Sequence, residues 1–169
     1  MKIAVIGANG QLGVDVVNAF RRDGGEVFPL SHADLELSSL ESVSAHLQTL
    51  RPDIVVNTAA MHHVDKCEQD PQKAFAVNGV GAYNLSIAAR NVDAAIMHVS
   101  TDYVFDGAKG SPYEETDAPR PLNAYGNTKL SGEYSRRRRV PRCTVICAPG
   151  TAITRASLPS AAPVKYATP

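Results

Sequence analysis

Short apolar runs alternate along the chain with segments whose apolar residues recur at helical spacing. The runs with the length of strands cover residues 2–6, 26–30, 53–57, 94–99 and 143–147. Apolar residues three and four positions apart predict helices over residues 12–24, 40–50, 71–91 and 124–134. Because strands and helices alternate, we expect an α/β fold of the Rossmann type, with a doubly wound parallel sheet in a three-layer arrangement.

The chain is long enough for one domain with its own core, since it has 169 residues of which 44% are apolar. Its three cysteines are odd in number and lack the spacing of a zinc site, so we expect reduced cysteines and no metal site. No apolar run has the length of a membrane span, and the first, at residues 3–6, is too short for a signal-peptide core. These features predict a cytoplasmic protein with no membrane partner.

The net charge of zero hides a difference between the two parts of the chain. Residues 1–134 hold 10 Lys and Arg against 17 Asp and Glu, whereas residues 135–169 hold 7 Lys and Arg and no acid. A basic tail can bind nucleic acid, but no aromatic residue lies among residues 136–139 to stack on bases. We therefore expect no nucleic-acid partner.

Three glycines follow the first predicted strand at the spacing G-x-x-G-x-x-G, namely Gly7, Gly10 and Gly13. One glycine permits a sharp turn, one lets the backbone approach a pyrophosphate, and one lets helix and strand pack closely. The N-terminus of the following helix adds free N–H groups and the positive end of its dipole. A loop of this kind between a strand and a helix predicts a dinucleotide site.

The acid that usually binds the cofactor ribose is missing, because the second strand ends Pro29-Leu30-Ser31-His32. Without a carboxylate there, a 2′-phosphate is not repelled. His32 either contacts that phosphate or is an ordinary surface histidine. The cofactor is therefore NADPH or NADH, with a slight preference expected for NADPH.

Tyr125 and Lys129 form the pattern Y-x-x-x-K, which places both on one face of a helix. A phenol has a pKa of about 10, and a nearby ammonium favours the phenolate, so we expect Lys129 to lower the pKa of Tyr125. The tyrosine then exchanges a proton with a substrate oxygen while hydride moves to or from carbon. Taken alone, the same pattern also fits a solvated helix face.

The segment after the fourth strand supplies hydroxyl groups at the carboxyl edge of the sheet, where ligands of open α/β sheets bind. Ser100 and Thr101 are placed there to hold a substrate carbonyl, or else they cap the loop. Asp102 and Tyr103 either contact the substrate or only order that loop.

Two features next to these segments have structural interpretations. Asn78 is expected to tie neighbouring strand ends together through side-chain hydrogen bonds. His62 and His63 are adjacent and have no acidic or cysteine partner set, so we interpret them as loop residues and not as metal ligands.

Together these segments resemble the dTDP-4-dehydrorhamnose reductase family of extended short-chain dehydrogenases/reductases. The resemblance rests on G-A-N-G-Q-L-G at Gly7, R-P-D-I-V-V-N-T-A-A at Arg51, V-D-K-C-E-Q-D-P at Val64, A-F-A-V-N at Ala74, S-T-D-Y-V-F-D-G at Ser100 and P-L-N-A-Y-G-N-T-K-L-S-G-E at Pro121. It implies NAD(P)H-dependent reduction of the C4 ketone of dTDP-4-dehydro-L-rhamnose to dTDP-L-rhamnose, a precursor of cell-envelope polysaccharide. A nucleotide-sugar substrate and a homodimer are implied with it.

The resemblance also assigns roles to individual residues. The catalytic residues that it implies are Thr101, Tyr125 and Lys129. The expected cofactor contacts are Gly7, Gly10, Gln11, Leu12, Gly13, Glu36, Leu37, Ala59, Ala60, Met61, Tyr125 and Lys129. The expected substrate contacts are Thr101, Asp102 and Tyr103. Some members of the family are described as using magnesium, but no ligand set in this chain supports a magnesium site.

We expect the resemblance to end near Tyr134, before the C-terminal substrate domain that such enzymes carry. Residues 1–150 are then an incomplete NAD(P)-binding Rossmann domain, and residues 151–169 an irregular or disordered tail. The abrupt acid-free composition from about Ser135 fits an out-of-frame translation, or alternatively a basic tail for an anionic partner. A chain without the substrate domain is expected to turn over far more slowly than a full-length relative, or not at all.

Two other functions remain open at this point. One is a nucleotide-sugar epimerase or dehydratase of the same extended family, since Asp102 supplies an acid beside the hydroxyl of Thr101. The other is a cofactor-binding regulatory subunit resembling that of methionine adenosyltransferase. The pattern of Thr101, Tyr125 and Lys129 argues against a purely regulatory role.

Overall fold

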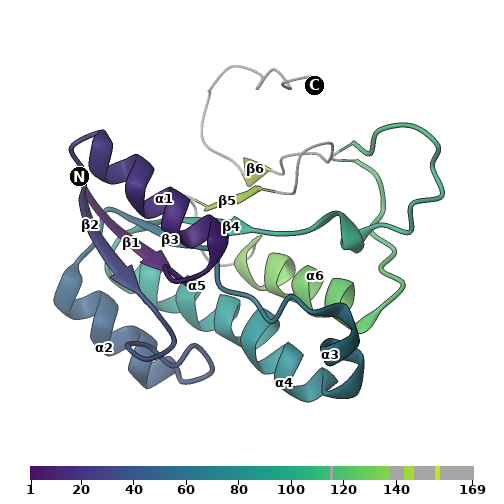
Figure 1. Ribbon diagram of the computed structural model, residues 1–169, viewed down its shortest axis with the longest axis horizontal. Coiled ribbons are helices and arrows are strands. Elements are labelled where there is room, and N and C mark those ends of the chain that lie inside the picture. Colours follow the sequence, from purple (N-terminus) through teal and green to yellow (C-terminus); the bar gives the residue numbers. More distant parts are fainter. Residues whose placement is uncertain (115, 138–142, 147–154, 157–169) are drawn as a thin grey trace.

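The computed structural model describes residues 1–114, 116–137, 143–146 and 155–156, in which strands and helices alternate (Figure 1). The strands are β1 (Lys2–Ile6), β2 (Glu26–Leu30), β3 (Ile54–Asn57), β4 (Ala95–Val99), β5 (Cys143–Ile146) and β6 (Arg155–Ala156). The α-helices are α1 (Gln11–Arg22), α2 (Leu40–Leu50), α3 (Val64–Gln69), α4 (Pro71–Phe75), α5 (Gly81–Asn91) and α6 (Ala124–Arg137). A π-helical turn, η1 (Ala76–Val80), joins α4 to α5, and a 3-10 turn, η2 (Asp102–Val104), follows β4.

The strands form one sheet in the order β2-β1-β3-β4-β5-β6. The pairs from β2 to β5 are parallel, and β6 pairs with β5 in the antiparallel sense. The chain winds outward in both directions from β1, so the strand order reverses between β1 and β3. A reversal of this kind leaves a crevice at the carboxyl ends of the strands, where ligands of open α/β sheets bind. The predicted doubly wound Rossmann fold is confirmed, with β6 as an antiparallel addition.

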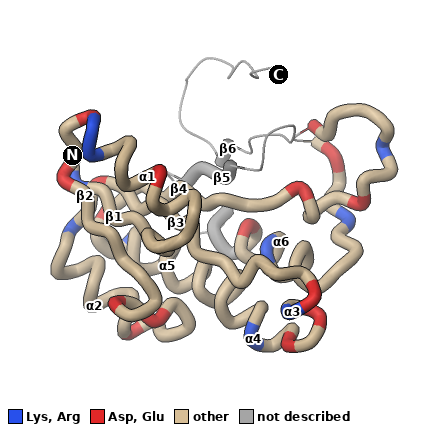
Figure 2. Tube along the Cα trace, in the orientation of Figure 1, with Lys and Arg blue, Asp and Glu red and all other residues tan. Residues whose placement is uncertain are grey.

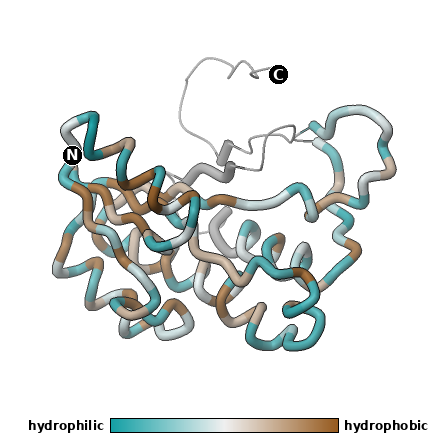
Figure 3. Tube along the Cα trace, in the orientation of Figure 1, coloured by the Kyte–Doolittle hydropathy of each residue, from teal (hydrophilic) through white to brown (hydrophobic). Residues whose placement is uncertain are grey.

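The two faces of the sheet bury alternate residues of the same strands, as a pleated strand requires. Ile3 and Val5 of β1 pack with Val17 of α1 on one face. Ala4 and Ile6 belong to a larger cluster on the other face, to which α2 and α5 contribute. Figure 1 shows α1 on one side of the sheet and α2 and α5 on the other. Apolar colour is concentrated on the strands between these helices in Figure 3, while Figure 2 shows charged residues mainly on helices and loops.

Most predicted elements lie within a few residues of their expected bounds, and two differ in kind. The helix predicted over residues 71–91 is interrupted by η1, a π-helical turn of the type that recurs at functional sites. The short helix α3 was not predicted, because six residues are too few to show an apolar period. Helix α6 ends at Arg137, a few residues after its predicted end at residue 134.

The strand predicted at residues 143–147 is present as β5, which adds to the sheet beside β4 in parallel register. Residues 135–146 therefore contribute a helix end and the predicted strand within the part that the structure describes. The tail predicted at residues 151–169 lies outside the described residues, apart from β6.

Candidate active site

A cavity of about 860 Å³ lies along the carboxyl edge of the sheet, between the glycine loop and helix α6. Every residue expected to contact a cofactor lines it: Gly7, Gly10, Gln11, Leu12, Gly13, Glu36, Leu37, Ala59, Ala60, Met61, Tyr125 and Lys129. The fold thus brings together positions that are more than a hundred residues apart in sequence. The cavity has the size and place of a ligand site in a doubly wound sheet.

The glycine loop is held by its own backbone. Gly7 has φ +78, a conformation that favours glycine, and its N–H donates to the Leu30 carbonyl at 2.8 Å. A Cβ at Gly13 would lie 2.2 Å from the Gly7 carbonyl oxygen, so only glycine fits there. At Gly10 a Cβ would meet only that same oxygen, at 3.3 Å. Gly7 and Gly13 therefore build the turn, while the surface at Gly10 faces the cavity that it lines.

Helix α1 begins at this loop with its N-terminus at the cavity wall. Its N-cap residue, Gly10, offers no side-chain acceptor to the N–H groups of the first turn. Those N–H groups, together with the positive end of the helix dipole, suit an anionic group such as a pyrophosphate. The first turn holds no acidic residue that would oppose an anion.

The other side of the cavity carries an acid, Glu36, which the family resemblance placed among the cofactor contacts. Glu36 lines the cavity, and its Oε2 lies 3.7 Å from Nδ1 of His32. Hydrogen bonds from the Ser38 hydroxyl and N–H hold the pKa of Glu36 below its usual value. Strand β2 itself ends at Leu30 without an acid, as the sequence predicted, and Glu36 follows it by six residues.

Tyr125 is half-buried at the first turn of α6, next to the segment that follows β4. Its ring packs edge-on against Tyr103, with centroids 5.7 Å apart. Burial raises the pKa of the Tyr125 phenol, and a hydrogen bond with the Thr101 side chain lowers it by less. The expected lowering by Lys129 is not found, so that prediction is wrong. In this geometry Tyr125 stays a protonated phenol at neutral pH.

Lys129 explains this difference by where its ammonium is held. The side chain is buried, and Nζ donates to the Val99 carbonyl at 2.6 Å. Nζ also lies 3.4 Å from Nε2 of His98. The lysine is therefore tied to the end of β4, whereas the largest influence on the pKa of Tyr125 is its burial.

The residues after β4 divide between the cavity and its rim. Ser100 lines the cavity, and its hydroxyl donates to the buried carboxylate of Glu133. Thr101 is buried next to Tyr125, and its hydroxyl donates to Asp102 at 3.1 Å. Asp102 and Tyr103 are exposed. The three residues predicted to contact substrate thus lie beside Tyr125 and outside the cavity that the cofactor positions line.

Asn78 joins the cofactor wall to helix α6. Its Oδ1 accepts from the Met61 N–H at 2.9 Å, and its Nδ2 donates to the Met61 carbonyl and to the Thr128 hydroxyl, both at 3.0 Å. The Thr128 hydroxyl donates in turn to the Tyr125 carbonyl at 2.9 Å. A tie by Asn78 was expected, but it joins the segment after β3 to α6 and not two strand ends.

Several cavity residues were not singled out by sequence reasoning. Some of them lie in the quoted segments and others carry no motif, but none was given a role of its own; they include Asn9, Thr58, Lys73, Val77 and Val99. For Lys73 the sequence offers one indication: it lies three residues after Asp70, whose carboxylate accepts from the Lys73 N–H and caps α4. That cap fixes where the helix begins and hence which of its residues meet the cavity.

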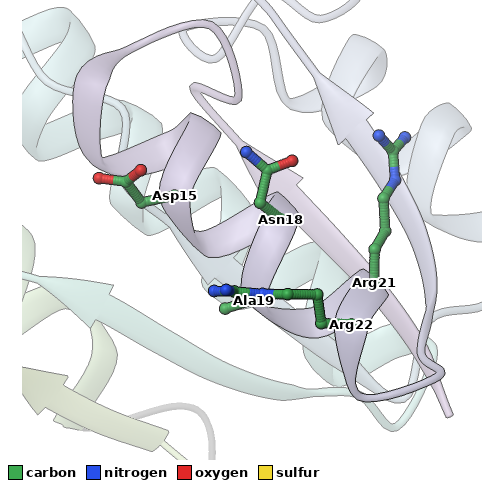
Figure 4. A pocket seen from close by; sticks show the side chains of 5 residues that line it. All are labelled: Asp15, Asn18, Ala19, Arg21 and Arg22. Atoms are coloured by element: carbon green, nitrogen blue, oxygen red, sulfur yellow. The ribbon is translucent and has the colours of Figure 1, made fainter.

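His62 and His63 precede α3 and are exposed, as expected of loop residues. In the described part of the chain no three His, Cys, Asp or Glu side chains lie together as a metal site would require. A second, shallower hollow lies over the outer surface of α1, where Asp15, Arg21 and Arg22 project from one helix (Figure 4). It shares no lining residue with the cavity at the glycine loop. Among the described helices, none is long and apolar enough to span a membrane.

The doubly wound sheet, the glycine loop and the cavity at its switch point define a Rossmann-type dinucleotide-binding domain. More narrowly, the chain belongs to the family described as RmlD substrate binding domain, which matches residues 1–150. The match continues past Tyr134, in agreement with the position of β5 in the sheet.

Curated relatives of this chain carry the name dTDP-4-dehydrorhamnose reductase. One from Burkholderia thailandensis is 44% identical over 135 residues, which is 80% of this chain and 45% of the relative. Another from Sinorhizobium fredii is 39% identical over 146 residues, which is 86% of this chain and 49% of the relative. The chain therefore spans about half the length of the curated relatives that it matches.

Solved structures that this chain resembles carry the same name as its curated relatives. A dTDP-4-dehydrorhamnose reductase from Clostridium acetobutylicum has a TM-score of 0.85 and 39% identity, covering 87% of this chain and 52% of that chain. The reductase from Bacillus anthracis in complex with NADP has a TM-score of 0.84 and 30% identity, covering 86% and 52%. The described domain therefore shares its backbone with a reductase whose crystal structure contains NADP.

Proposed function

We propose that this chain is the cofactor-binding part of a cytoplasmic NAD(P)H-dependent reductase that converts dTDP-4-dehydro-L-rhamnose to dTDP-L-rhamnose. The observation that carries the proposal is the single cavity that the glycine loop, Tyr125 and Lys129 share. A pyrophosphate site at one end and a phenol at the other are what a hydride-transfer site needs. The names of the relatives supply the sugar substrate.

The residues present fit a nicotinamide dinucleotide. Gly10 and the first turn of α1 would hold the pyrophosphate, since a larger residue at Gly10 would occupy the cavity wall. Glu36 and Leu37 would lie at the adenosine end, and Ala59, Ala60 and Met61 along the middle. When bound, the reduced nicotinamide supplies the hydride that the ketone carbon receives. NADPH is the slightly preferred cofactor because β2 ends without a carboxylate, and the charge of Glu36 limits this preference. No described residue set calls for magnesium.

Tyr125 would donate the proton that the ketone oxygen needs as it becomes a hydroxyl. The raised pKa suits this direction, because the group must be protonated before the reaction begins. The Thr101 and Tyr125 hydroxyl groups lie within hydrogen-bonding reach of each other, and a substrate carbonyl oxygen bound beside them would accept the proton from Tyr125. Lys129, which the Val99 carbonyl holds in place, would donate a hydrogen bond to the nicotinamide ribose.

The sugar nucleotide would approach from the exposed side of Tyr125. Asp102 and Tyr103 are exposed there, and the edge-on contact between Tyr103 and Tyr125 leaves an aromatic surface on which a sugar ring can pack. A homodimer belongs to this proposal only through the family resemblance.

A second candidate function rests on one contact. The Thr101 hydroxyl donates to the Asp102 carboxylate at 3.1 Å, which puts an acid beside the proposed catalytic hydroxyl. Nucleotide-sugar epimerases and dehydratases use such an acid in elimination or ring oxidation. If this chemistry applied, Asp102→Asn would abolish turnover; in the reductase it would leave most of the turnover.

The test is a substrate-dependent loss of nicotinamide absorbance with the purified chain, NADPH or NADH, and dTDP-4-dehydro-L-rhamnose. We expect oxidation of the cofactor only when sugar is present, with dTDP-L-rhamnose as product. Because the chain spans about half of its relatives, we expect slower turnover than in a full-length relative. A nucleotide-sugar product without net cofactor oxidation would support the epimerase alternative and contradict the reductase.

A further inference from the structure

A buried chain of hydrogen-bonding groups connects the cofactor wall to Lys129 by a route that the proposed reaction does not use. The Ala59 N–H donates to Oδ1 of Asn57 at 3.1 Å. Nδ2 of Asn57 lies 2.9 Å from Nδ1 of His98, and Nε2 of His98 lies 3.4 Å from Nζ of Lys129. Asn57, His98 and Lys129 are each at most 2% exposed.

The sheet and α6 place these groups. Asn57 and His98 are register partners on the adjacent parallel strands β3 and β4, so their side chains project from the same face of the sheet. Gly132 on α6 lets the imidazole approach the helix, since a Cβ there would lie 3.4 Å from Nε2 of His98 and 2.5 Å from the Asn78 carbonyl oxygen. A histidine ring is therefore built into the contact between sheet and helix, with each nitrogen at a polar neighbour.

The donors and acceptors along this chain fix where His98 carries its proton. The carbonyl oxygen of Asn57 is engaged by the Ala59 N–H, so the group facing His98 is the amide NH₂, which only donates. Nδ1 of His98 must then accept, and the neutral ring carries its proton on Nε2. An ammonium has only donors, so this arrangement offers Lys129 no lone pair. The distances agree, since Nζ is 3.4 Å from Nε2 but 2.6 Å from the Val99 carbonyl.

A second arrangement of the same groups has the opposite polarity. If the Asn57 amide turns over, its carbonyl accepts from Nδ1–H of His98, and Nε2 presents a lone pair to the Lys129 ammonium. The ring stays neutral and the number of protons is unchanged, because the proton lost at Nε2 is regained at Nδ1. The Ala59 N–H then loses its acceptor and needs another. Ala59 lines the cofactor cavity, so an oxygen of a bound cofactor can replace it.

We propose that His98 is a positioning residue for Lys129, switched by cofactor binding through Asn57 and the Ala59 amide. Without cofactor, His98 carries its proton on Nε2 and the lysine is held by the Val99 carbonyl. With cofactor, His98 carries it on Nδ1, and Nε2 accepts from Lys129, which fixes the ammonium under the ribose. The role in catalysis rests on the proposed function, whereas the link between Asn57 and His98 does not.

The experiment is long-range 1H–15N NMR of the whole chain labelled with 15N-histidine, recorded with and without NADPH, with the His98 signals assigned by their loss in His98→Gln. His46 is an internal reference, because its Nδ1 lies 2.8 Å from the Ser42 carbonyl and must carry a proton. We expect His98 in the Nε2–H form without cofactor and in the Nδ1–H form at saturation. The Nδ1–H form in the free protein, or no change at saturation, would overturn the proposal.

The variant Asn57→Asp separates this proposal from the function. A carboxylate keeps an acceptor for the Ala59 N–H and turns a second acceptor toward Nδ1, so His98 should be protonated at Nδ1 even without cofactor. Persistence of the unprotonated Nδ1 in this variant would overturn the coupling. Nicotinamide fluorescence on the same samples measures cofactor binding. If no cofactor bound, the proposed function would be contradicted, while the Asn57→Asp result would still decide whether Asn57 sets the protonation site of His98.

Replacement of His98 gives a second readout. We expect His98→Leu to weaken NADPH binding about tenfold, since Lys129 loses a buried hydrogen-bonding partner. His98→Gln should restore binding to within about threefold of wild type, because an amide can present its carbonyl to the ammonium. Equal loss in both variants would show that the ring only fills space, contrary to the proposal.

Discussion

The two ends of the cavity are built in different ways. At the glycine-loop end, the backbone of seven consecutive residues forms the wall; Gly13 packs against Gly7 within the loop, and Gly7 packs against Ala59 after β3. At the Tyr125 end, buried side chains from β3, β4, η1 and α6 hold one another. The first end is formed mainly by the backbone of one loop, and the second by side chains that distant elements bring together. The two ends should therefore respond differently to substitution.

The largest effect is expected at the packed end, where the proton is donated. Tyr125→Phe should lower kcat by about a thousandfold, the scale of a lost general acid. NADPH binding should change by less than about twofold, since the pyrophosphate end is untouched. Steady-state kinetics with a binding titration would measure both. Tyr103→Phe, which keeps the ring contact, is the matched control and should retain most activity.

Substitutions at the glycine-loop end should weaken NADPH binding more than they slow the reaction step. Gly13→Ala should weaken NADPH binding about a hundredfold and destabilise the fold by about 2 kcal/mol, because its Cβ would lie 2.2 Å from the Gly7 carbonyl oxygen. Gly10→Ala should weaken binding about tenfold with little loss of stability, as its Cβ meets only that oxygen at 3.3 Å. Equal stability losses in both variants, measured by urea unfolding, would contradict the division between turn and ligand surface.

Substitution of Asn78 tests whether activity depends on the buried hydrogen bonds at the Tyr125 end of the cavity. Asn78→Asp removes the donors to Met61 and Thr128 and should cost about 2 kcal/mol of unfolding free energy and about tenfold in kcat. The control is Asn84→Asp, which removes the buried hydrogen bond to the Leu37 carbonyl on the α2 side of the sheet. It should cost similar stability and leave kcat nearly unchanged. If kcat fell equally in Asn84→Asp, the loss of rate in Asn78→Asp would come from lower global stability and not from the lost Asn78 hydrogen bonds.

The smallest effect concerns the choice of cofactor. Because Ser38 keeps the pKa of Glu36 low, its carboxylate is charged at neutral pH and should repel a 2′-phosphate. Glu36→Gln should therefore shift the ratio of NADPH to NADH affinity toward NADPH by about threefold, a modest change at an exposed site. The same shift should develop in wild type as pH falls through the lowered pKa and the carboxylate is protonated. A ratio that does not change would place the 2′ position away from Glu36.

The same contrast explains what could be predicted from the sequence. The strand–loop–helix around Gly7, Gly10 and Gly13 is a local pattern, and Tyr125 and Lys129 share a helix face by their spacing, so both were found. Glu36 lies six residues beyond β2, so spacing alone does not identify it as an acid at the cavity, and its assignment as a cofactor contact came from the family resemblance. The pKa of Tyr125 depends on burial and on the attachment of Lys129 to Val99, neither of which spacing reveals.

Long-range partners were the least predictable feature. In the sequence, His98 is one residue of a predicted strand. Only the pairing of β3 with β4 and the packing of α6 against β4 bring its ring to both Asn57 and Lys129. Strand β5 was predicted from its apolar run, but its membership in the family's fold was not, because the charged segment before it obscures the continuity.

The measurement that tests the central claim most directly is a titration of the purified chain with NADPH and NADH, followed by nicotinamide fluorescence, for wild type and Gly10→Ala. The account predicts saturable binding that the substitution weakens about tenfold while the fold is retained. An affinity that Gly10→Ala leaves unchanged, or no binding of either cofactor to a folded chain, would contradict the assignment of the cavity as a nicotinamide-cofactor site.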